Sequence, residues 1–131
     1  MKDLKPTCRI AVVQAAPVLF DKTACTDKAV RLIAECAQHG AELIVFPELF
    51  IPGYPYGMTF GFTVGARNEG GRKDWQLYCG NSIVVPGPET ERLAAAAKAA
   101  QAAGIRTLNA AAAVMVSKYF SRKMAQSTMR K

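Results

Sequence analysis

The sequence predicts an α/β fold, in which helices pack on a parallel sheet. Two short runs of branched apolar residues, at 9–14 and 41–46, have the composition of buried strands. Between them, from residue 21, lies a segment with helical spacing of its apolar side chains. A strand–helix–strand unit makes the two strands parallel neighbours, so we expect a sheet with helices packed on it.

The predicted helix between the strands has a start and an end signal. Asp21 or Thr23 is a suitable N-cap, and Gly40 stands where a left-handed residue closes a helix. The apolar residues spaced three and four apart are Ala29, Leu32, Ile33, Cys36 and Ala37. They predict one buried face.

Pro47 ends the second strand, and the elements after it are less regular. We predict a long ordered loop with room for one helical turn over residues 51–71, a short helix over 73–81, an extended link over 82–88, an Ala-rich helix over 90–103 closed by Gly104, and a third strand near Ile105. Glycine and proline dominate the loop, and loops of this length are usually functional.

Composition favours one globular domain. The chain has 131 residues, half of them hydrophobic and 21% charged. It has no apolar run long enough for a membrane span and no signal-peptide pattern, so we expect a cytoplasmic protein. The cysteines are Cys8, Cys25, Cys36 and Cys79. They form no CxxC pair and His39 is the only histidine, so we expect no metal site, disulfide framework or cofactor.

The net charge of +7 raises the question of nucleic-acid binding. Residues 1–105 hold 11 of the 17 Lys and Arg and all 10 acids, which leaves +1, whereas residues 106–131 hold the other 6 bases and no acid. The basicity therefore belongs to the last segment, which lacks an aromatic or zinc-finger pattern. We predict a solvated end and neither a nucleic-acid nor a membrane partner.

Glu48 is the candidate catalytic residue. It follows the second predicted strand by two residues, with Pro47 restricting the turn. Ligands of open α/β sheets collect beyond the carboxyl ends of the strands, where a carboxylate is useful chemically. The alternative is an ordinary solvated loop acid.

The context of Glu48 resembles a known family. Residues 40–55, GAELIVFPELFIPGYP, are similar to the signature around the active-site glutamate of the nitrilase, or carbon–nitrogen hydrolase, family. The similarity continues in GMTFG at 57–61, GRKDW at 71–75 and VPGPETERL at 85–93, and covers about 100 residues. The later segments resemble the nitrilase and cyanide hydratase branch more than the amidases.

This resemblance implies a fold, a reaction and a partner. The fold is the α-β-β-α sandwich, of which residues 1–104 would be the N-terminal part with an incomplete sheet. In the reaction, a Cys thiolate attacks the carbon of a small organic nitrile or cyanide, Glu48 handles the thiol proton, and a Lys stabilises the developing charge. The thioimidate intermediate leads to an acid or an amide, and the sequence does not distinguish between these two products. Family members are homo-oligomers.

The chain lacks two catalytic residues of the family. The family's lysine and nucleophilic cysteine come well downstream, and none of the four cysteines here has a matching context. Glu48 is thus the only catalytic residue that we name, and we predict that the chain alone is inactive. The alternative function is that of a non-catalytic fragment that associates with nitrilase-like subunits. An unpaired sheet edge and uncovered apolar faces are expected in either case.

Residues 105–131 form a basic tail without the family pattern. A shift of reading frame near residue 105 would explain both features. One permitted codon choice for residues 123–130, read from the third base, encodes DGAIYNA, which is similar to the hairpin that the family has there. Sequencing the gene tests this hypothesis, which fails if no alternative frame encodes the missing lysine and cysteine segments.

Overall fold

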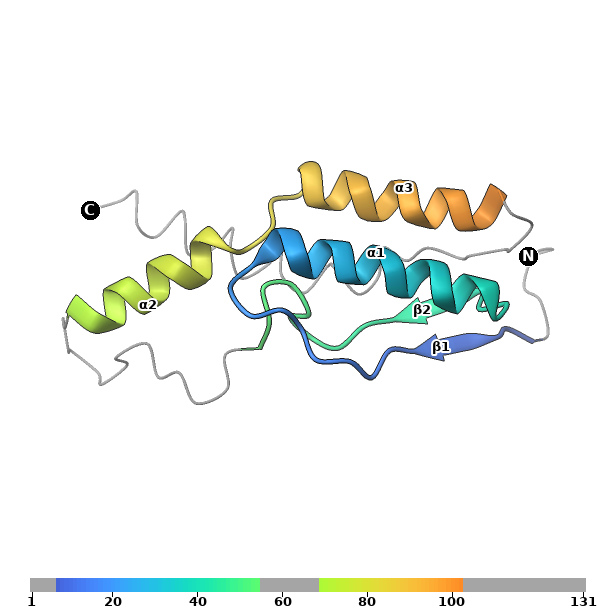
Figure 1. Cartoon of the computed structure of the whole chain (residues 1–131), viewed down its shortest axis with the longest axis horizontal. Coiled ribbons are helices and arrows are strands. Elements are labelled where there is room, and N and C mark those ends of the chain that lie inside the picture. The colour runs from blue at the N-terminus through green and yellow to red at the C-terminus, as the bar shows by residue number, and fades with distance from the viewer. Residues whose placement is uncertain (1–6, 55–68, 103–131) are drawn as a thin grey trace, which may run out of the picture.

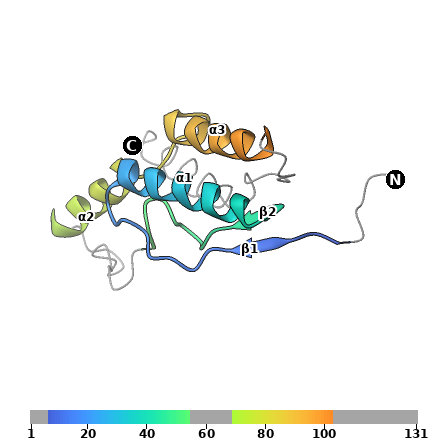
Figure 2. The same ribbon diagram turned by 45° about the vertical axis from the view of Figure 1, so that its right-hand side comes forward.

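The computed structural model describes residues 7–54 and 69–102. Along the chain, the elements are β1 (Ile10–Val12), α1 (Lys22–Gln38), β2 (Leu43–Val45), α2 (Glu69–Gly80) and α3 (Pro88–Ala102). In two views of the ribbon, α1 lies between the pair of strands and α3, and α2 extends away from this stack (Figures 1 and 2). The predicted mixture of helices and parallel strands is confirmed.

The two strands pair in parallel, with Ile10 opposite Leu43 and Val12 opposite Val45. Both are three residues long, shorter than the six predicted. Backbone bonds continue the ladder beyond them, because the Glu42 N–H donates to the Arg9 carbonyl over 2.7 Å and the Val13 N–H to the Val45 carbonyl over 2.8 Å. Beyond these bonds the chains leave the ladder, so apolar composition overstated the strand length.

Local signals determine both ends of α1. The Asp21 carboxylate accepts a hydrogen bond from the Ala24 N–H at 2.8 Å, so Asp21 is the N-cap and Thr23 lies inside the helix. At the other end, Gly40 has a φ of 79°, as predicted. Its N–H donates to the Ala37 carbonyl at 2.8 Å and the next N–H donates to the Cys36 carbonyl at 3.1 Å, which satisfies the last carbonyls of the helix.

The core lies between α1, the inner face of the strands and α3. Ile33 is 1% exposed, and Ala29 and Ala37 are also buried, whereas Leu32 and Cys36 of the predicted face are only partly buried. The other core residues of this cluster are Val13, Cys25, Ala41, Ile44, Phe50, Ile51, Ile83 and Leu93. Ile83 and the pair Phe50-Ile51 thus pack with α1, although none of them belongs to a helix or strand.

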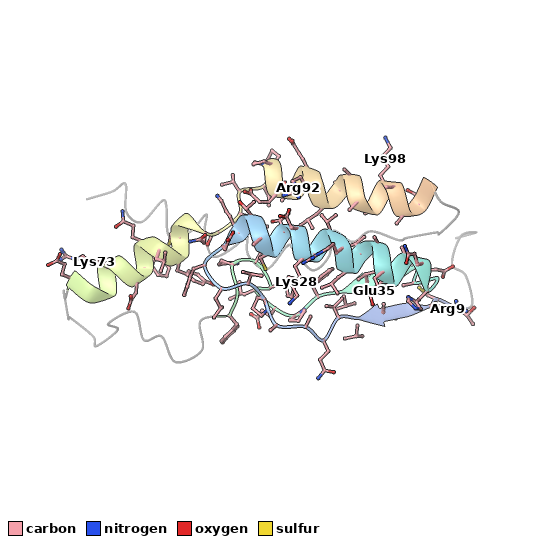
Figure 3. All side chains as sticks on the ribbon, viewed as in Figure 1. Arg9, Lys28, Glu35, Lys73, Arg92 and Lys98 are labelled. Carbon is pink, nitrogen blue, oxygen red and sulfur yellow. The ribbon has the colours of Figure 1, made fainter. Side chains whose placement is uncertain are left out.

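α3 packs along α1 and begins at Pro88, two residues earlier than predicted. Proline is favoured at the first helical position because the N–H that it lacks has no helical partner there. Arg92 reaches from α3 to Asp27 of α1, and it lies between the two helices in Figure 3. Lys22 and Glu89 form a second, partly buried ion pair at 3.7 Å.

α2 begins at Glu69, earlier than the predicted 73, so the predicted loop over 51–71 overran the helix. Gly70 and Gly71, which fall in the predicted loop, lie inside the helix, and Gly71 is buried. Glu69 lies in the first turn of α2, where a negative charge is stabilised, and its carboxylate pairs with Lys73 at 3.0 Å. The rest of the loop, the third strand near Ile105 and the basic tail lie outside the described residues.

The outer face of the strand pair is apolar and exposed. Ile10 and Val12 are 55% and 76% exposed, and Val45, opposite Val12, is also exposed. The side chains between them, Ala11 and Ile44, face the core. Strands that are apolar on both faces are typical of sheets covered on both sides. Within residues 7–54 and 69–102 the sheet has two strands and helices on only one side, and the complete sandwich remains a prediction.

Candidate active site

Glu48 is exposed and lies in a tight turn beyond the carboxyl end of β2. The strand ends at Val45, so Glu48 follows it by three residues and not by two as predicted. Inside the turn the Phe50 N–H donates to the Pro47 carbonyl over 3.2 Å, and the Gly53 N–H donates to the Leu49 carbonyl over 2.8 Å. The backbone around Glu48 is therefore held by its own hydrogen bonds.

This turn has an unfavourable backbone conformation directly after the candidate base. Leu49 has a φ of 51°, a region that residues with a Cβ atom seldom adopt. The next residues, Phe50 and Ile51, are buried in the core, and their rings and methyl groups anchor the turn. Strained residues of this kind persist when the surrounding packing determines them, and they are frequent at functional sites.

An open hollow of about 510 Å³ lies at the same end of the sheet. Its walls are residues 12–16, which leave β1, together with Phe46 and Pro47, which lead to Glu48. The hollow is thus bordered by both strand ends, where ligands of α/β sheets are expected. Its lining is mainly apolar, apart from Gln14 and the backbone.

The Tyr78 phenol lies within electrostatic reach of Glu48. Tyr78 on α2 is partly buried, and this burial raises the pKa of its phenol, with smaller upward contributions from Cys79, Tyr54 and the Glu48 carboxylate. The Trp75 ring lies 6.2 Å from that of Tyr78, one turn earlier on α2. Neither Tyr54 nor Tyr78 was predicted from the sequence as a site residue. The signals that could have identified them are the place of Tyr54 inside the motif and the three-residue spacing of Trp75 and Tyr78, which puts these two on one helix face.

The structure places the four cysteines in different environments. Cys25 is buried and Cys36 is partly buried on α1, whereas Cys8 before β1 and Cys79 on α2 are exposed. Cys25 lies near the start of α1 and Cys79 near the end of α2. Burial raises the pKa of Cys25, of Cys36 and of Cys79. A raised pKa opposes thiolate formation, so these three thiols lack the activation that a nucleophile requires.

These environments predict the order of thiol labelling. With Ellman's reagent at neutral pH, the exposed Cys8 should react first and the exposed Cys79 next, because its raised pKa leaves less thiolate. Cys36 should react more slowly, and Cys25 only after unfolding, because the reagent needs an accessible thiolate. Peptide mapping assigns each site, and Cys25→Ser should remove one equivalent in urea but none from the fast phase. Labelling of Cys25 as fast as Cys79 in the native protein would contradict the described burial.

The same burial predicts the pH dependence of stability. A thiol with a raised pKa in the folded state stays protonated there, while the unfolded thiol ionises above about pH 8.5. The unfolded state is then favoured, so the free energy of unfolding should fall as the pH rises above that value. Cys25→Ser should make this fall shallower in urea titrations.

Comparison with known proteins defines the family. The carbon-nitrogen hydrolase family model matches residues 9–112. The chain is 52% identical over 92 residues to a bifunctional nitrilase/nitrile hydratase of Nicotiana tabacum, covering 70% of this chain and 26% of that protein. It is 49% identical over 92 residues to nitrilase 3 of Arabidopsis thaliana, covering 70% of this chain and 27% of that protein. The chain belongs to the carbon–nitrogen hydrolase family, and its nitrilase relatives match it in the N-terminal part.

Two further observations accompany this assignment. The chain spans about a quarter of the length of the relatives that it matches. None of the three helices in the described part is long and apolar enough to cross a bilayer.

Proposed function

We propose that this chain supplies the general base of a nitrilase-type hydrolase, and that this base is Glu48. The observation that supports the proposal is the position of Glu48 in an exposed, anchored turn at the carboxyl end of β2, inside the segment that matches the family. The substrate class is a small organic nitrile or cyanide, and the location expected from the sequence is the cytoplasm. Assembly as a homo-oligomer is part of the same proposal.

In the proposed mechanism, Glu48 removes the proton of the attacking thiol. A thiol is mostly protonated near neutral pH, so a carboxylate at the sulfur removes its proton as the sulfur attacks the nitrile carbon. The proton passes to the nitrile nitrogen and a thioimidate forms. Water adds to the thioimidate, ammonia leaves, and a second water hydrolyses the thioester to the acid. Expulsion of the thiol from the first tetrahedral intermediate gives the amide instead.

The nucleophilic Cys and the charge-stabilising Lys of this mechanism have no matching context in the chain. Cys25 has both its donor and its acceptor functions engaged in the core, and Cys36 is partly buried against the core. We therefore propose that the chain alone does not turn over nitriles. Residues 105–131 are proposed to be a basic tail with a frameshift as its origin, and the family match extends into this segment as far as residue 112.

The second candidate function is association without catalysis. The exposed apolar face of Ile10, Val12 and Val45 favours it, because such a surface is stable only when covered. In this case the chain would bind nitrilase-like subunits through that face and contribute no turnover of its own.

Ammonia release tests whether the chain alone is a catalyst. Purified protein is incubated with a panel of aliphatic and aromatic nitriles and with cyanide, next to a tag-matched blank. We expect no ammonia above the blank from the chain alone. Turnover that is present in the wild type and lost in Glu48→Gln would show that the chain is a complete catalyst and would contradict the proposed inactivity.

A further inference from the structure

The Cys25 side chain lies between the two segments that leave the strands. Its Sγ donates a hydrogen bond to the Phe50 carbonyl at 3.0 Å and accepts one from the Val18 N–H at 3.4 Å. Val18 belongs to the segment after β1, and Phe50 belongs to the turn that contains Glu48. One thiol on the first turns of α1 thus joins both sides of the candidate active site.

The environment of Cys25 keeps the thiol able to donate. The residue is 0% exposed, and burial raises the pKa of its thiol, so the S–H proton stays in place at neutral pH. A thiolate would have no proton for the Phe50 carbonyl. The Phe50 carbonyl is itself in the buried core, where an unsatisfied backbone acceptor costs free energy.

Other contacts bring the same two segments together. The Phe20 N–H donates to the Pro52 carbonyl at 3.4 Å. A Cβ atom at Gly53 would meet the Pro17 ring at 3.2 Å, and Gly53 has a φ of 106°. The turn after Glu48 therefore fits closely against the chain that leaves β1, and Cys25 connects the two from within the core.

We propose that Cys25 is a positioning residue, whose thiol holds the turn at residues 48–53 against the segment after β1 and so determines where the Glu48 carboxylate stands. The functional meaning of this placement rests on the proposed role of Glu48 as general base. The placement itself is a property of the folded chain, so it is measurable without any hydrolytic activity.

Tyr78 reports the position of Glu48, because the carboxylate contributes to the raised pKa of that phenol. The chain is labelled with tyrosine carrying ¹³C at Cζ, the ring carbon that bears the hydroxyl. The NMR signal of Tyr78 is assigned as the one that is lost in Tyr78→Phe. Glu48→Gln should lower the pKa of Tyr78. Cys25→Ala should lower it in the same direction, by no more than Glu48→Gln does, since the turn is released but the carboxylate remains.

The controls separate positioning from general destabilisation. Cys25→Ser retains a donor and should restore the wild-type pKa of Tyr78, and Cys36→Ala on the same helix should leave it unchanged. In the Glu48→Gln background, Cys25→Ala should add no further shift. Circular dichroism at each pH confirms that the folded state is measured, and Cys25→Val replaces Cys25→Ala if the smaller side chain prevents folding.

Two results would overturn the proposal. One is a wild-type pKa of Tyr78 in folded Cys25→Ala or Cys25→Val. The other is an equal fall of this pKa in the Glu48→Gln background, which would show that Cys25 acts on Tyr78 without Glu48. If Glu48→Gln leaves enzymatic activity unchanged, the proposed function is refuted but the Tyr78 measurement still stands. The two failures are therefore distinguishable.

Discussion

Replacing Glu48 by Gln should lower kcat for nitrile hydrolysis by about 10²- to 10⁴-fold, the usual contribution of a positioned general base. The assay uses a chimera in which residues 9–104 of this chain replace the matching segment of the tobacco relative, which supplies the remaining three quarters of the enzyme. Glutamine keeps the size of the side chain but does not accept the thiol proton. Ammonia release under saturating nitrile gives kcat.

A second acid provides the matched control for this experiment. Glu91 is exposed in the first turn of α3, and Glu91→Gln in the same chimera should leave kcat within twofold of the wild type. The role assigned to Glu48 fails if Glu48→Gln retains most of the activity, or if both glutamine variants lose it equally.

Ile33→Ala should destabilise the chain by about 2–5 kcal/mol, because it removes methyl groups from a closely packed site and leaves a cavity. Ile33 is 1% exposed and lies at the centre of the buried face of α1. Small domains have about 5–15 kcal/mol of stability in total, so we expect the cooperative urea transition to move to much lower concentration or to disappear.

Ile10→Ala is the control of identical chemistry at an exposed site. Its side chain is on the outer face of β1, and we expect a change within about 0.5 kcal/mol. Equal effects of the two substitutions on the urea midpoint would mean that the core does not lie between α1 and the strands, or that the outer face is covered in solution.

The features that the sequence predicted correctly depend on neighbours along the chain. The left-handed Gly40 and the buried Ala29 and Ile33 follow from spacings of one to four residues, which a helix imposes by its geometry. The N-cap was narrowed to Asp21 or Thr23, and Asp21 is the cap. The parallel pairing of β1 and β2 follows from the helix between them, because a crossover leaves the strands pointing the same way.

The features that the sequence did not predict depend on contacts between distant residues. The hydrogen bond from Cys25 to Phe50 spans 25 positions, and no periodic pattern connects them. The start of α2 was misplaced for a similar reason, since the burial of Gly71 is a tertiary effect that overrides its low helix propensity. Strand ends were overestimated because apolar composition does not show where a partner strand stops.

The candidate site combines both kinds of information. The identity of Glu48 came from the motif around it, and its exposed position after β2 agrees with the placement expected for a ligand-facing carboxylate. Tyr78 comes from a different segment, and only the fold brings its phenol within electrostatic reach of Glu48 and of Tyr54.

The central claim is that Glu48 removes the proton of the attacking thiol. The chimera is quenched with acid during a single turnover. Intact-mass measurement then detects the covalent adduct of the nitrile on the enzyme. The wild-type chimera should accumulate this adduct, whereas the Glu48→Gln chimera should form it at least about 100-fold more slowly. Adduct formation at the same rate in both proteins would contradict the claim, because the thiol would then be activated without Glu48.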